Sequence, residues 1–315
     1  MEPFSHSIED YPEGIILPID KPYRWTSADV IRKVKFAAIR HFGKKNLKVG
    51  HAGTLDPLAT GILLVCIGPA TKRAEELQRS AKQYVAGVTF GATTPSYDLE
   101  KEIDAEFPLD GVSREALEAV LPTFVGEQEQ VAPLFSAKSV DGVRAYELAR
   151  KMYREHLRTG ADFNHEQSEL LSRQQINIYG LELIDYRPAG CSPEGTVSTL
   201  GRVRGRGPLT ESVGGMERSE SSAGEQPAGR VDKSNRIHVA DISGYDLPTA
   251  MIRVDCSKGT YIRALARDLG EALGSGAFLS SLRRTGNGGF TIEDAISLDD
   301  AMQLLSSGSQ PSDKQ

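Results

Sequence analysis

Cysteine is scarce in this chain of 315 residues, which contains only Cys66, Cys191 and Cys256. The three are widely spaced and form no CxxC pair, so a structural zinc site is not expected. Few, scattered thiols are typical of proteins from a reducing compartment. The N-terminal sequence MEPFSHSIEDYPEG is acidic and polar and does not resemble a secretory signal. We therefore predict a cytoplasmic location.

Long hydrophobic runs and an excess of positive charge are also missing. The longest apolar run, Ile62–Ile67, is far too short to cross a bilayer. The chain has 37 Lys and Arg against 43 Asp and Glu, a net charge of −6. This balance argues against a purely electrostatic RNA coat protein. It leaves room for a local basic surface, because binding depends on where the charges lie.

Several signatures of catalysis are absent as well. The sequence has no GxGxxG, no GxxxxGK[ST], no HExxH and no serine-centred elbow. Dinucleotide-dependent, nucleotide-hydrolysing and zinc-dependent chemistry therefore find no support in the sequence.

Aromatic residues are few between Pro188 and about Asn235, where Gly, Ser and charged residues dominate. Such a segment cannot bury enough apolar area to offset the entropy lost on ordering. We predict a disordered insertion over residues 188–235. Its Arg-Gly pieces leave open an RNA contact as the alternative to a plain solvated loop. The final stretch, SSGSQPSDKQ, is expected to fray.

Elsewhere, strand patterns and helix patterns are interleaved. Val30, Val34 and Ala38 share one face of a helix that Ser27 can cap and Gly43 ends. Further helices are expected over residues 70–80, 113–121 and 143–157, and from residue 262 to Gly270 or Gly274. Strands are expected over residues 15–19, 83–91, 175–186 and 250–257. There is no regular βαβ rhythm, so an α+β domain with a mixed sheet is favoured over a Rossmann fold.

Positive charge is concentrated near the N-terminus. Between residues 21 and 50 nine basic residues face one acid, Asp29. Such a surface can hold a phosphate backbone, although a solvated helix face is an equally simple reading. Arg283 and Arg284 lie far away in sequence and could join it in space.

Asp56 is a lone acid in the stretch VGHAGTLDPLATGILLV, just before a run that resembles a buried strand. An Asp before Pro in such a loop is usually a turn former. The alternative is a rigidly held carboxylate that acts as a nucleophile or general base. No second acid lies nearby in the sequence, so a paired-carboxylate glycosidase has no local support.

Tyr261 and Arg263 occur in the stretch CSKGTYIRALARDLG. In an extended segment, residues two apart share a face, so a ring and a guanidinium would point to the same side. Such a pair can stack on a base and bind a carboxylate or phosphate. The alternative is a core tyrosine beside a surface arginine.

Taken together, five blocks of the sequence resemble the successive motifs of the tRNA pseudouridine-55 synthases, in the family's order. The blocks are DKPYRWTS, VGHAGTLDPLATGILLV, KQYVAGVTFGATTPSYD, PLFSAKSVDGVRAYELAR and CSKGTYIRALARDLGEALGSGAFLSSLRRT. The resemblance covers roughly residues 13–187 and 236–295. It implies a pseudouridine synthase fold, with a mixed, mostly antiparallel central sheet flanked by helices and loops.

The resemblance also implies a domain plan and a reaction. Residues 1–12 would be an N-terminal extension, 13–300 the catalytic domain and 301–315 a tail, without the C-terminal RNA-binding domain of many bacterial members. The substrate would be the T-arm of tRNA, where uridine 55 is flipped out and isomerised without a cofactor or a metal. No long exposed apolar helix is evident in the sequence, so we expect a monomer.

The roles of single residues follow from the same resemblance. It implies that Asp56 is the catalytic aspartate, Tyr84 lies in the base pocket and takes part in catalysis, and Arg263 pairs with Asp56. The substrate-binding residues would be His51, Tyr84, Tyr261, Leu282 and Lys21, the last as support for the RNA-facing loop. The chain departs from the family at Arg24, where the pattern DKPxGxTS has glycine.

Two other functions remain open. A tRNA-binding or folding factor could open the tRNA elbow without chemistry. A glycosidase-like enzyme could use Asp56 on a nucleoside and would release free uracil.

Overall fold

The computed structural model describes residues 4–135, 139–140, 143–160, 173–190 and 237–306. Most of the predicted insertion 188–235 and the end of the predicted tail lie outside these residues. No helix in the described ranges is long and apolar enough to cross a membrane.

One ten-stranded sheet organises the molecule. Its strands in chain order are β1 (Ile15–Lys21), β2 (Val49–His51), β3 (Ala59–Ile67), β4 (Lys82–Phe90), β7 (Gly126–Val131), β10 (Arg173–Arg187), β11 (Thr249–Cys256), β12 (Ala277–Asn287), β13 (Phe290–Thr291) and β14 (Ile296–Ser297). The main path runs β14-β1-β3-β12-β4-β11-β10-β7, with β2 beside β3 and β13 beside β12. Only the β1–β14 and β3–β12 pairs are parallel. The predicted α+β fold with a mixed, mostly antiparallel sheet is confirmed.

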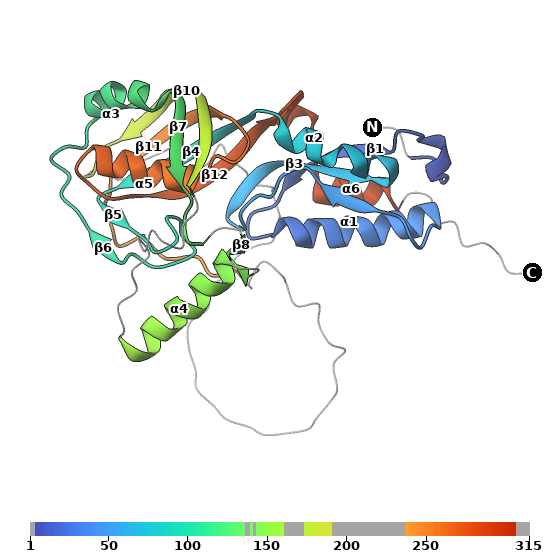
Figure 1. Ribbon diagram of the computed structural model, residues 1–315, viewed down its shortest axis with the longest axis horizontal. Coiled ribbons are helices and arrows are strands. Elements are labelled where there is room, and N and C mark those ends of the chain that lie inside the picture. Colours follow the sequence, from blue (N-terminus) through green and yellow to red (C-terminus); the bar gives the residue numbers. More distant parts are fainter. Residues whose placement is uncertain (1–3, 136–138, 141–142, 161–172, 191–236, 307–315) are drawn as a thin grey trace, which may run out of the picture.

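Apart from α4 (Ala145–Thr159), the longer helices pack beside the sheet (Figure 1). The other helices are α1 (Ser27–Phe42), α2 (Ala74–Arg79), α3 (Arg114–Val120), α5 (Ile262–Ala272) and α6 (Leu298–Leu304), with short 3-10 turns η1 (Ile8–Asp10), η2 (Gly68–Arg73), η3 (Leu121–Phe124) and η6 (Ile292–Asp294). Two small sheets pair β5 (Ala92–Thr93) with β6 (Ala105–Glu106) and β8 (Ser139–Val140) with β9 (Val143–Arg144).

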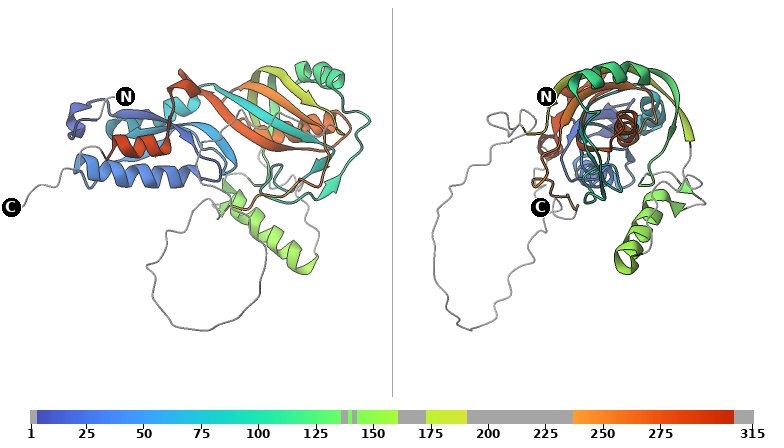
Figure 2. Two further views of the ribbon diagram at one scale, coloured as in Figure 1. Left: turned by 180° about the vertical axis from the view of Figure 1, so that it is seen from behind. Right: turned by 90° about the vertical axis from the view of Figure 1, so that its left-hand side faces the viewer.

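The two largest hydrophobic clusters of the described residues pack on different parts of the sheet, beneath the helices that Figure 1 shows toward its two ends. One packs α1 and α6 against β1 and β3; the other packs α3 and α5 against β4, β10, β11 and β12. The strands β3 and β12 join the two halves. Helix α4 projects from the body of the molecule, as both views in Figure 2 show.

Strands β3 and β12 approach each other closely at Gly61. Its φ of +97° lies in the left-handed region, and a Cβ there would lie 2.2 Å from the carbonyl oxygen of Arg284. Only glycine fits both conditions. Gly61 therefore lets two segments more than two hundred residues apart pair at the centre of the molecule.

Both ends of the described chain pack on the core around α1. Ile8 is buried, and Phe4 and Tyr11 pack against the core around α1, so residues 4–12 are not a loose extension. The expected boundary at residue 300 falls inside α6, where Ala301 and Leu305 are buried. The folded unit thus continues to residue 306.

Several element boundaries also differ from the sequence-based expectations. The residue that caps α1 is Thr26, whose side chain accepts from the Asp29 N–H at 3.0 Å, and not Ser27. Gly43 ends the helix in a left-handed conformation, as predicted. The helix expected over residues 70–80 is divided into η2 and α2.

The extended segment expected through Tyr261 and Arg263 is also wrong. Tyr261 is the N-cap of α5 and Arg263 already belongs to that helix. The two side chains reach one cleft because a helix begins between them, and not because they share the face of a strand.

Candidate active site

Asp56 lies in a tight turn between β2 and β3. The carbonyl of Asp56 accepts from the N–H of Ala59 at 3.1 Å, and Pro57 occupies the second position of the turn. Proline favours that position because its ring fixes φ near the value that the turn needs. The turn therefore gives the Asp56 backbone a defined conformation just before a fully buried strand.

Arg284 holds the residues that lead into this turn. Its guanidinium is buried and donates to three carbonyls, those of Ile62 at 2.7 Å, Gly53 at 3.1 Å and Thr54 at 3.4 Å. The expectation that Arg284 joins a basic surface is therefore wrong, because its guanidinium is buried. Arg283 pairs with Asp20 at 2.8 Å.

Ser27 and Lys21 hold the turn from the other side. The Ser27 hydroxyl accepts from the Leu55 N–H at 2.9 Å and lies 3.2 Å from the Leu55 carbonyl. Lys21 is fully buried, and its ammonium donates to the carbonyls of Trp25, Pro22 and Pro57 at 2.6, 3.0 and 3.2 Å. Burial lowers the pKa of Lys21 to about 7. Its position fits support of the Asp56 loop and gives no direct access to a ligand.

Arg263 forms a two-point contact with Asp56. Nε lies 3.0 Å from Oδ2 and an NH2 donates to Oδ1 at 3.2 Å. The guanidinium is buried and also donates to the carbonyls of Ser96 and Phe135 at 3.1 and 3.0 Å, whereas the Asp56 side chain keeps 39% of its exposure. Burial would lower the pKa of Arg263, but Asp56 and Asp98 outweigh that effect and raise it. A fixed cation thus orients a carboxylate that a ligand can reach.

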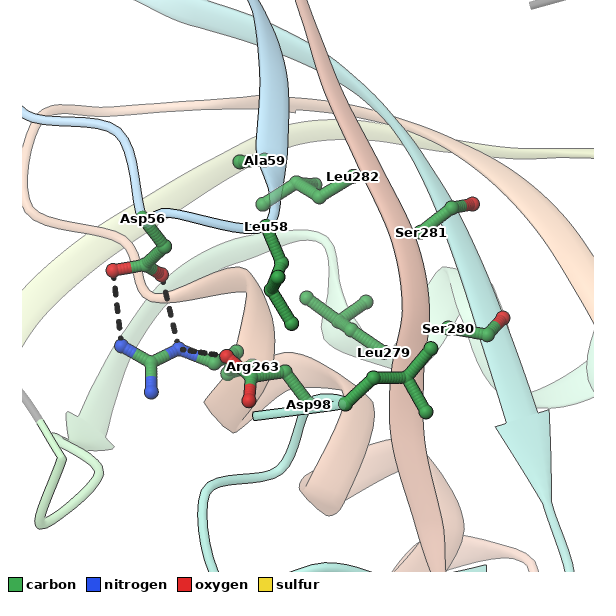
Figure 3. Close-up of a pocket in the computed structure, with 10 residues that line it drawn as sticks. Asp56, Leu58, Ala59, Asp98, Arg263, Leu279, Ser280, Ser281 and Leu282 are labelled. Atoms are coloured by element: carbon green, nitrogen blue, oxygen red, sulfur yellow. Dashed lines mark hydrogen bonds and ion pairs between the residues drawn. The ribbon is translucent and has the colours of Figure 1, made fainter. Parts of the chain in front are cut away.

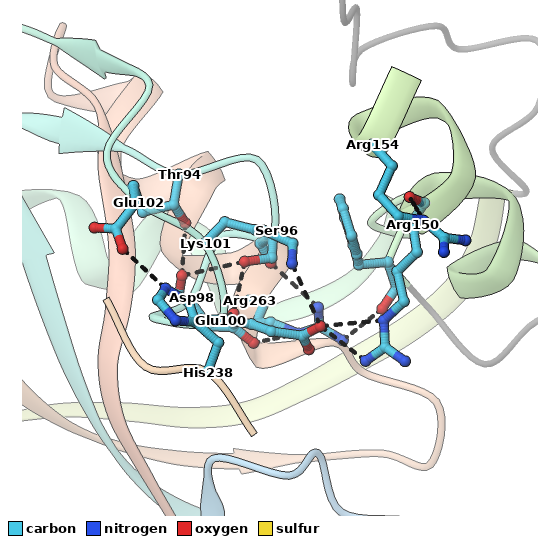
Figure 4. A network of polar contacts seen from close by, with 11 residues as sticks. Thr94, Ser96, Asp98, Glu100, Lys101, Glu102, Arg150, Arg154, His238 and Arg263 are labelled. Atoms are coloured by element: carbon cyan, nitrogen blue, oxygen red, sulfur yellow. Dashed lines mark hydrogen bonds and ion pairs between the residues drawn. The ribbon is translucent and has the colours of Figure 1, made fainter. Parts of the chain in front are cut away.

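Asp98 is the second acid that the sequence did not indicate. Its Oδ2 lies 3.7 Å from Nε of Arg263, and its side chain is nearly buried (Figure 3). Burial raises the pKa of Asp98, and Arg263 opposes that rise. Figure 4 shows how the contacts continue outward, since Glu100 donates its N–H to Asp98 and pairs with Arg150 of α4 at 2.8 Å.

One cleft of about 300 Å³ gathers five of the predicted residues, and these are Asp56, Tyr84, Tyr261, Arg263 and Leu282. Tyr84 comes from β4 and is mostly buried, which raises its pKa. In the antiparallel pairing of β4 with β12, Tyr84 lies opposite Arg284. Figure 3 shows Leu58, Leu279 and Leu282 next to Asp56, so the acid has an apolar flank.

His51 lies on the other side of the same acid. It lines a second cavity of about 310 Å³ together with Asp56, Arg263 and Phe135. Burial and the nearby Arg284 lower the pKa of His51, which favours the neutral ring. Asp56 therefore lies between two hollows, one lined by tyrosines and one by the histidine.

The loop that departs from the family pattern has a physical explanation. Arg24 has a φ of +62°, in the region where glycine is favoured. Its guanidinium donates to the Ile237 carbonyl at 2.6 Å. That contact holds an arginine in a conformation that a glycine would adopt without strain.

The basic segment 21–50 is less uniform than its sequence indicates. Lys21 is buried, and three of its cations have ion-pair partners: Arg32 with Asp29, Lys33 with Asp299, and Lys44 with Glu9. Lys35, Arg40, Lys45 and Lys48 are exposed. A basic surface exists here, but it is smaller than the nine charges suggest.

Four residues of the site had no clear signal in the sequence: Ser27, Asp98, Arg284 and Gln130. The buried Gln130 amide donates to the Tyr261 carbonyl at 3.1 Å and accepts its N–H at 2.8 Å. Ser27, Asp98 and Arg284 stand inside the blocks that carry the family resemblance, but no pattern in the sequence indicated the contacts that they make. In the part of the chain that the structure describes, no group of three or more His, Cys, Asp or Glu could hold a metal ion.

Comparison with solved structures identifies the class of fold. The chain aligns with a structure titled "Crystal Structure of a Cbf5-Nop10-Gar1 Complex" at a TM-score of 0.53 and 22% identity, over 94% of this chain and 56% of that one. It also aligns with a structure titled "Structure of H/ACA RNP bound to a substrate RNA containing 2'-deoxyuridine" at a TM-score of 0.51 and 19% identity, over 98% of this chain and 61% of that one. The fold is that of the pseudouridine synthases.

Sequence relatives then identify the family. The chain is 41% identical over 296 residues to tRNA pseudouridine synthase B of Phocaeicola vulgatus, covering 94% of this chain and 95% of the relative. It is 36% identical over 282 residues to the protein of the same name from Thermus thermophilus, covering 90% of this chain and 75% of the relative. Residues 40–194 match the family described as "TruB family pseudouridylate synthase (N terminal domain)". The chain belongs to the TruB family of pseudouridylate synthases.

The expectation that a C-terminal domain is absent is wrong. Residues 263–313 match the family described as "tRNA pseudouridylate synthase B C-terminal domain". In the structure this match covers α5, β12 and α6, which pack into the two cores. This region is not a separate unit, because its strand β12 lies within the ten-stranded sheet.

Proposed function

We propose that the protein isomerises uridine 55 to pseudouridine in the T-loop of tRNA, with Asp56 as the nucleophile. The observation that carries this proposal is the fork between Arg263 and the half-exposed Asp56 at a cleft lined by Tyr84, Tyr261 and Leu282. Membership of the TruB family supports it independently.

The reaction breaks the bond between N1 of uracil and C1′ of the ribose and forms a bond from C5 to C1′. The hydrogen on C5 leaves as a proton, and N1 gains one. Atoms and electrons balance within the nucleotide, so the isomerisation needs no redox partner and no second substrate. Asp56 attacks either the base or the sugar in the first step, and both routes use the same carboxylate.

The cleft residues then have distinct tasks. The uridine must leave its stack, which costs about a few kcal/mol, and the faces of Tyr84 and Tyr261 offset that loss. Leu282 lines the pocket, and His51 holds the displaced nucleotide from the second cavity. Lys21 and Arg284 keep the Asp56 loop in place from within the protein. We propose a monomer acting in the cytoplasm.

The test is mass spectrometry of a T-loop RNA incubated with the purified protein. The product should have unchanged mass and should react with a pseudouridine-selective reagent at a single position. Unmodified RNA after prolonged incubation with folded enzyme would contradict the proposal.

Asp56→Asn separates catalysis from binding. The variant should retain RNA affinity and form no pseudouridine, because an amide is a poor nucleophile. Full modification by Asp56→Asn would exclude Asp56 as the nucleophile. RNA binding by the wild-type protein without any pseudouridine would instead support a factor that opens the tRNA elbow without chemistry. Free uracil in the wild-type products would indicate a glycosidase.

A further inference from the structure

The cleft beside Asp56 contains more positive charge than its catalytic pair requires. Four cationic side chains line it, Lys82, Lys258, Arg263 and Arg284, against a single carboxylate, Asp56. Arg263 is matched by Asp56, and Arg284 donates to three backbone carbonyls and also interacts with the Tyr84 side chain. Lys82 and Lys258 form no ion pair with any described residue. One end of the cleft therefore has two cations and no acid.

Lys82 is built into the wall of the cleft. It lies two residues before Tyr84 on β4, so both side chains leave the same face of the strand. The residue is only 6% exposed, and its ammonium donates to the carbonyls of Gln78 and Ser80. An ammonium has three N–H donors, so one is left for a ligand.

Lys258 faces this end of the cleft from the turn between β11 and α5. It is exposed, and Gly259 next to it has a φ of +92°, which shapes the turn. The two lysines are close enough to repel. Burial, then Arg284 and Lys258, lower the pKa of Lys82 to about 8, so an anion between the lysines would relieve a repulsion already present in the free protein.

We propose that Lys82 and Lys258 form a subsite for one phosphodiester of the RNA strand, adjacent to the everted uridine. This rests on the proposed function. The monoanionic phosphate would take the free donor of Lys82 and the ammonium of Lys258. Its position at the Tyr84 end of the cleft would fix the strand on one side of the base and so help to hold the flipped nucleotide over Asp56.

The test combines one protein change with one RNA change. Lys258→Gln removes a charge from an exposed residue, so the fold should persist. T-loop RNAs carrying a single neutral methylphosphonate, either 5′ or 3′ of the target uridine, remove one phosphate charge each. Affinity is measured for all combinations, with Arg114→Gln on α3, which lines no part of the cleft, as the matched charge control.

With wild-type protein, one of the two methylphosphonates should weaken binding by about tenfold. Lys258→Gln should weaken binding of ordinary RNA similarly and should add little further loss on that methylphosphonate RNA. Additive losses at both linkages, or unchanged affinity of Lys258→Gln, would overturn the subsite. Lys82→Arg, which keeps the charge, should bind better than Lys82→Gln.

The two proposals fail in different ways. Loss of the subsite would leave a wild-type enzyme that forms pseudouridine without coupling between Lys258 and any one phosphate. Loss of the proposed function would appear as an absence of pseudouridine with ordinary RNA.

Discussion

Asp56 and Arg263 are separated by 207 positions in the chain, yet two nitrogens of the guanidinium contact the two oxygens of the carboxylate, at 3.0 and 3.2 Å. One hydrogen bond and one close ion-pair contact, one to each carboxylate oxygen, restrict the position and the tilt of the acid. Because the guanidinium is buried and bound to two backbone carbonyls, it cannot follow Asp56 if the acid moves. The pair therefore holds the carboxylate of the proposed nucleophile in one orientation.

Replacing Arg263 with lysine should separate charge from geometry. Arg263→Lys keeps a cation near Asp56 but cannot form the fork. We expect kcat/KM for pseudouridine formation to fall by about 10- to 100-fold, equivalent to roughly 1.4–2.8 kcal/mol. Arg267→Lys, one turn further along α5 and paired with Asp268, is the control and should stay near wild type. Equal activity of both variants would show that charge alone suffices.

Gln130 should matter through the backbone of Tyr261. Gln130→Met has a similar volume but leaves a backbone N–H and carbonyl unpaired, at about 1–3 kcal/mol for each unsatisfied buried group. We expect lower stability and, because Tyr261 starts α5, at least a tenfold loss of kcat/KM. Gln128→Met on the same strand removes a bond to Phe124 and serves as the control. A variant that loses stability without losing activity in its folded fraction would contradict the positioning role.

Arg284 and Arg283 form a natural comparison of adjacent residues. Arg284→Met leaves three carbonyls around the Asp56 loop without their hydrogen-bond donor. We therefore expect the free energy of unfolding to fall by about 3 kcal/mol or more. Arg283→Met breaks a more exposed pair with Asp20 and should cost about 1 kcal/mol or less. Urea unfolding of both variants checks the difference. Similar losses would mean that Arg284 does not support the loop.

The buried Lys21 should give stability a measurable dependence on pH. Its pKa is about 7 in the folded protein and near 10.4 in an unfolded chain, so above pH 7 the unfolded chain binds the extra proton. Stability should therefore rise with pH from 7 to 9, at up to about 1.4 kcal/mol per pH unit for one proton. Cys256, whose pKa is raised to about 11 by burial, opposes this rise above the unfolded thiol pKa of about 8.5, so the slope from Lys21 should be clearest between pH 7 and 8.

Urea midpoints at pH 7, 8 and 9 test this dependence. Lys21→Met should show a smaller slope than wild type, and the exposed Lys45→Met should keep the wild-type slope. Lys82 has a pKa of about 8, so it should still make stability rise with pH above pH 8 in the Lys21→Met variant. An unchanged slope in Lys21→Met would exclude Lys21 as the source.

The sequence by itself determined the features that depend on neighbours along the chain. Apolar spacing predicted α1 and its end at Gly43, alternation predicted β4 and β11, and Asp before Pro in a Gly- and Thr-rich stretch marked the turn at Asp56. These features follow from local backbone preferences and from one-sided burial, which leave a periodic trace in the sequence.

Tertiary structure alone decided what the charged and polar residues do. Nothing local distinguishes Arg284, which binds carbonyls inside the protein, from Arg283, which pairs near the surface. Likewise, nothing in the local sequence distinguishes Asp98, whose side chain is nearly buried beside Arg263, from an ordinary exposed acid in a turn. A charge becomes buried and structural only when distant segments bring unpaired groups to it, and here the pairing of β3 with β12 at Gly61 brings Arg284 to the Asp56 loop.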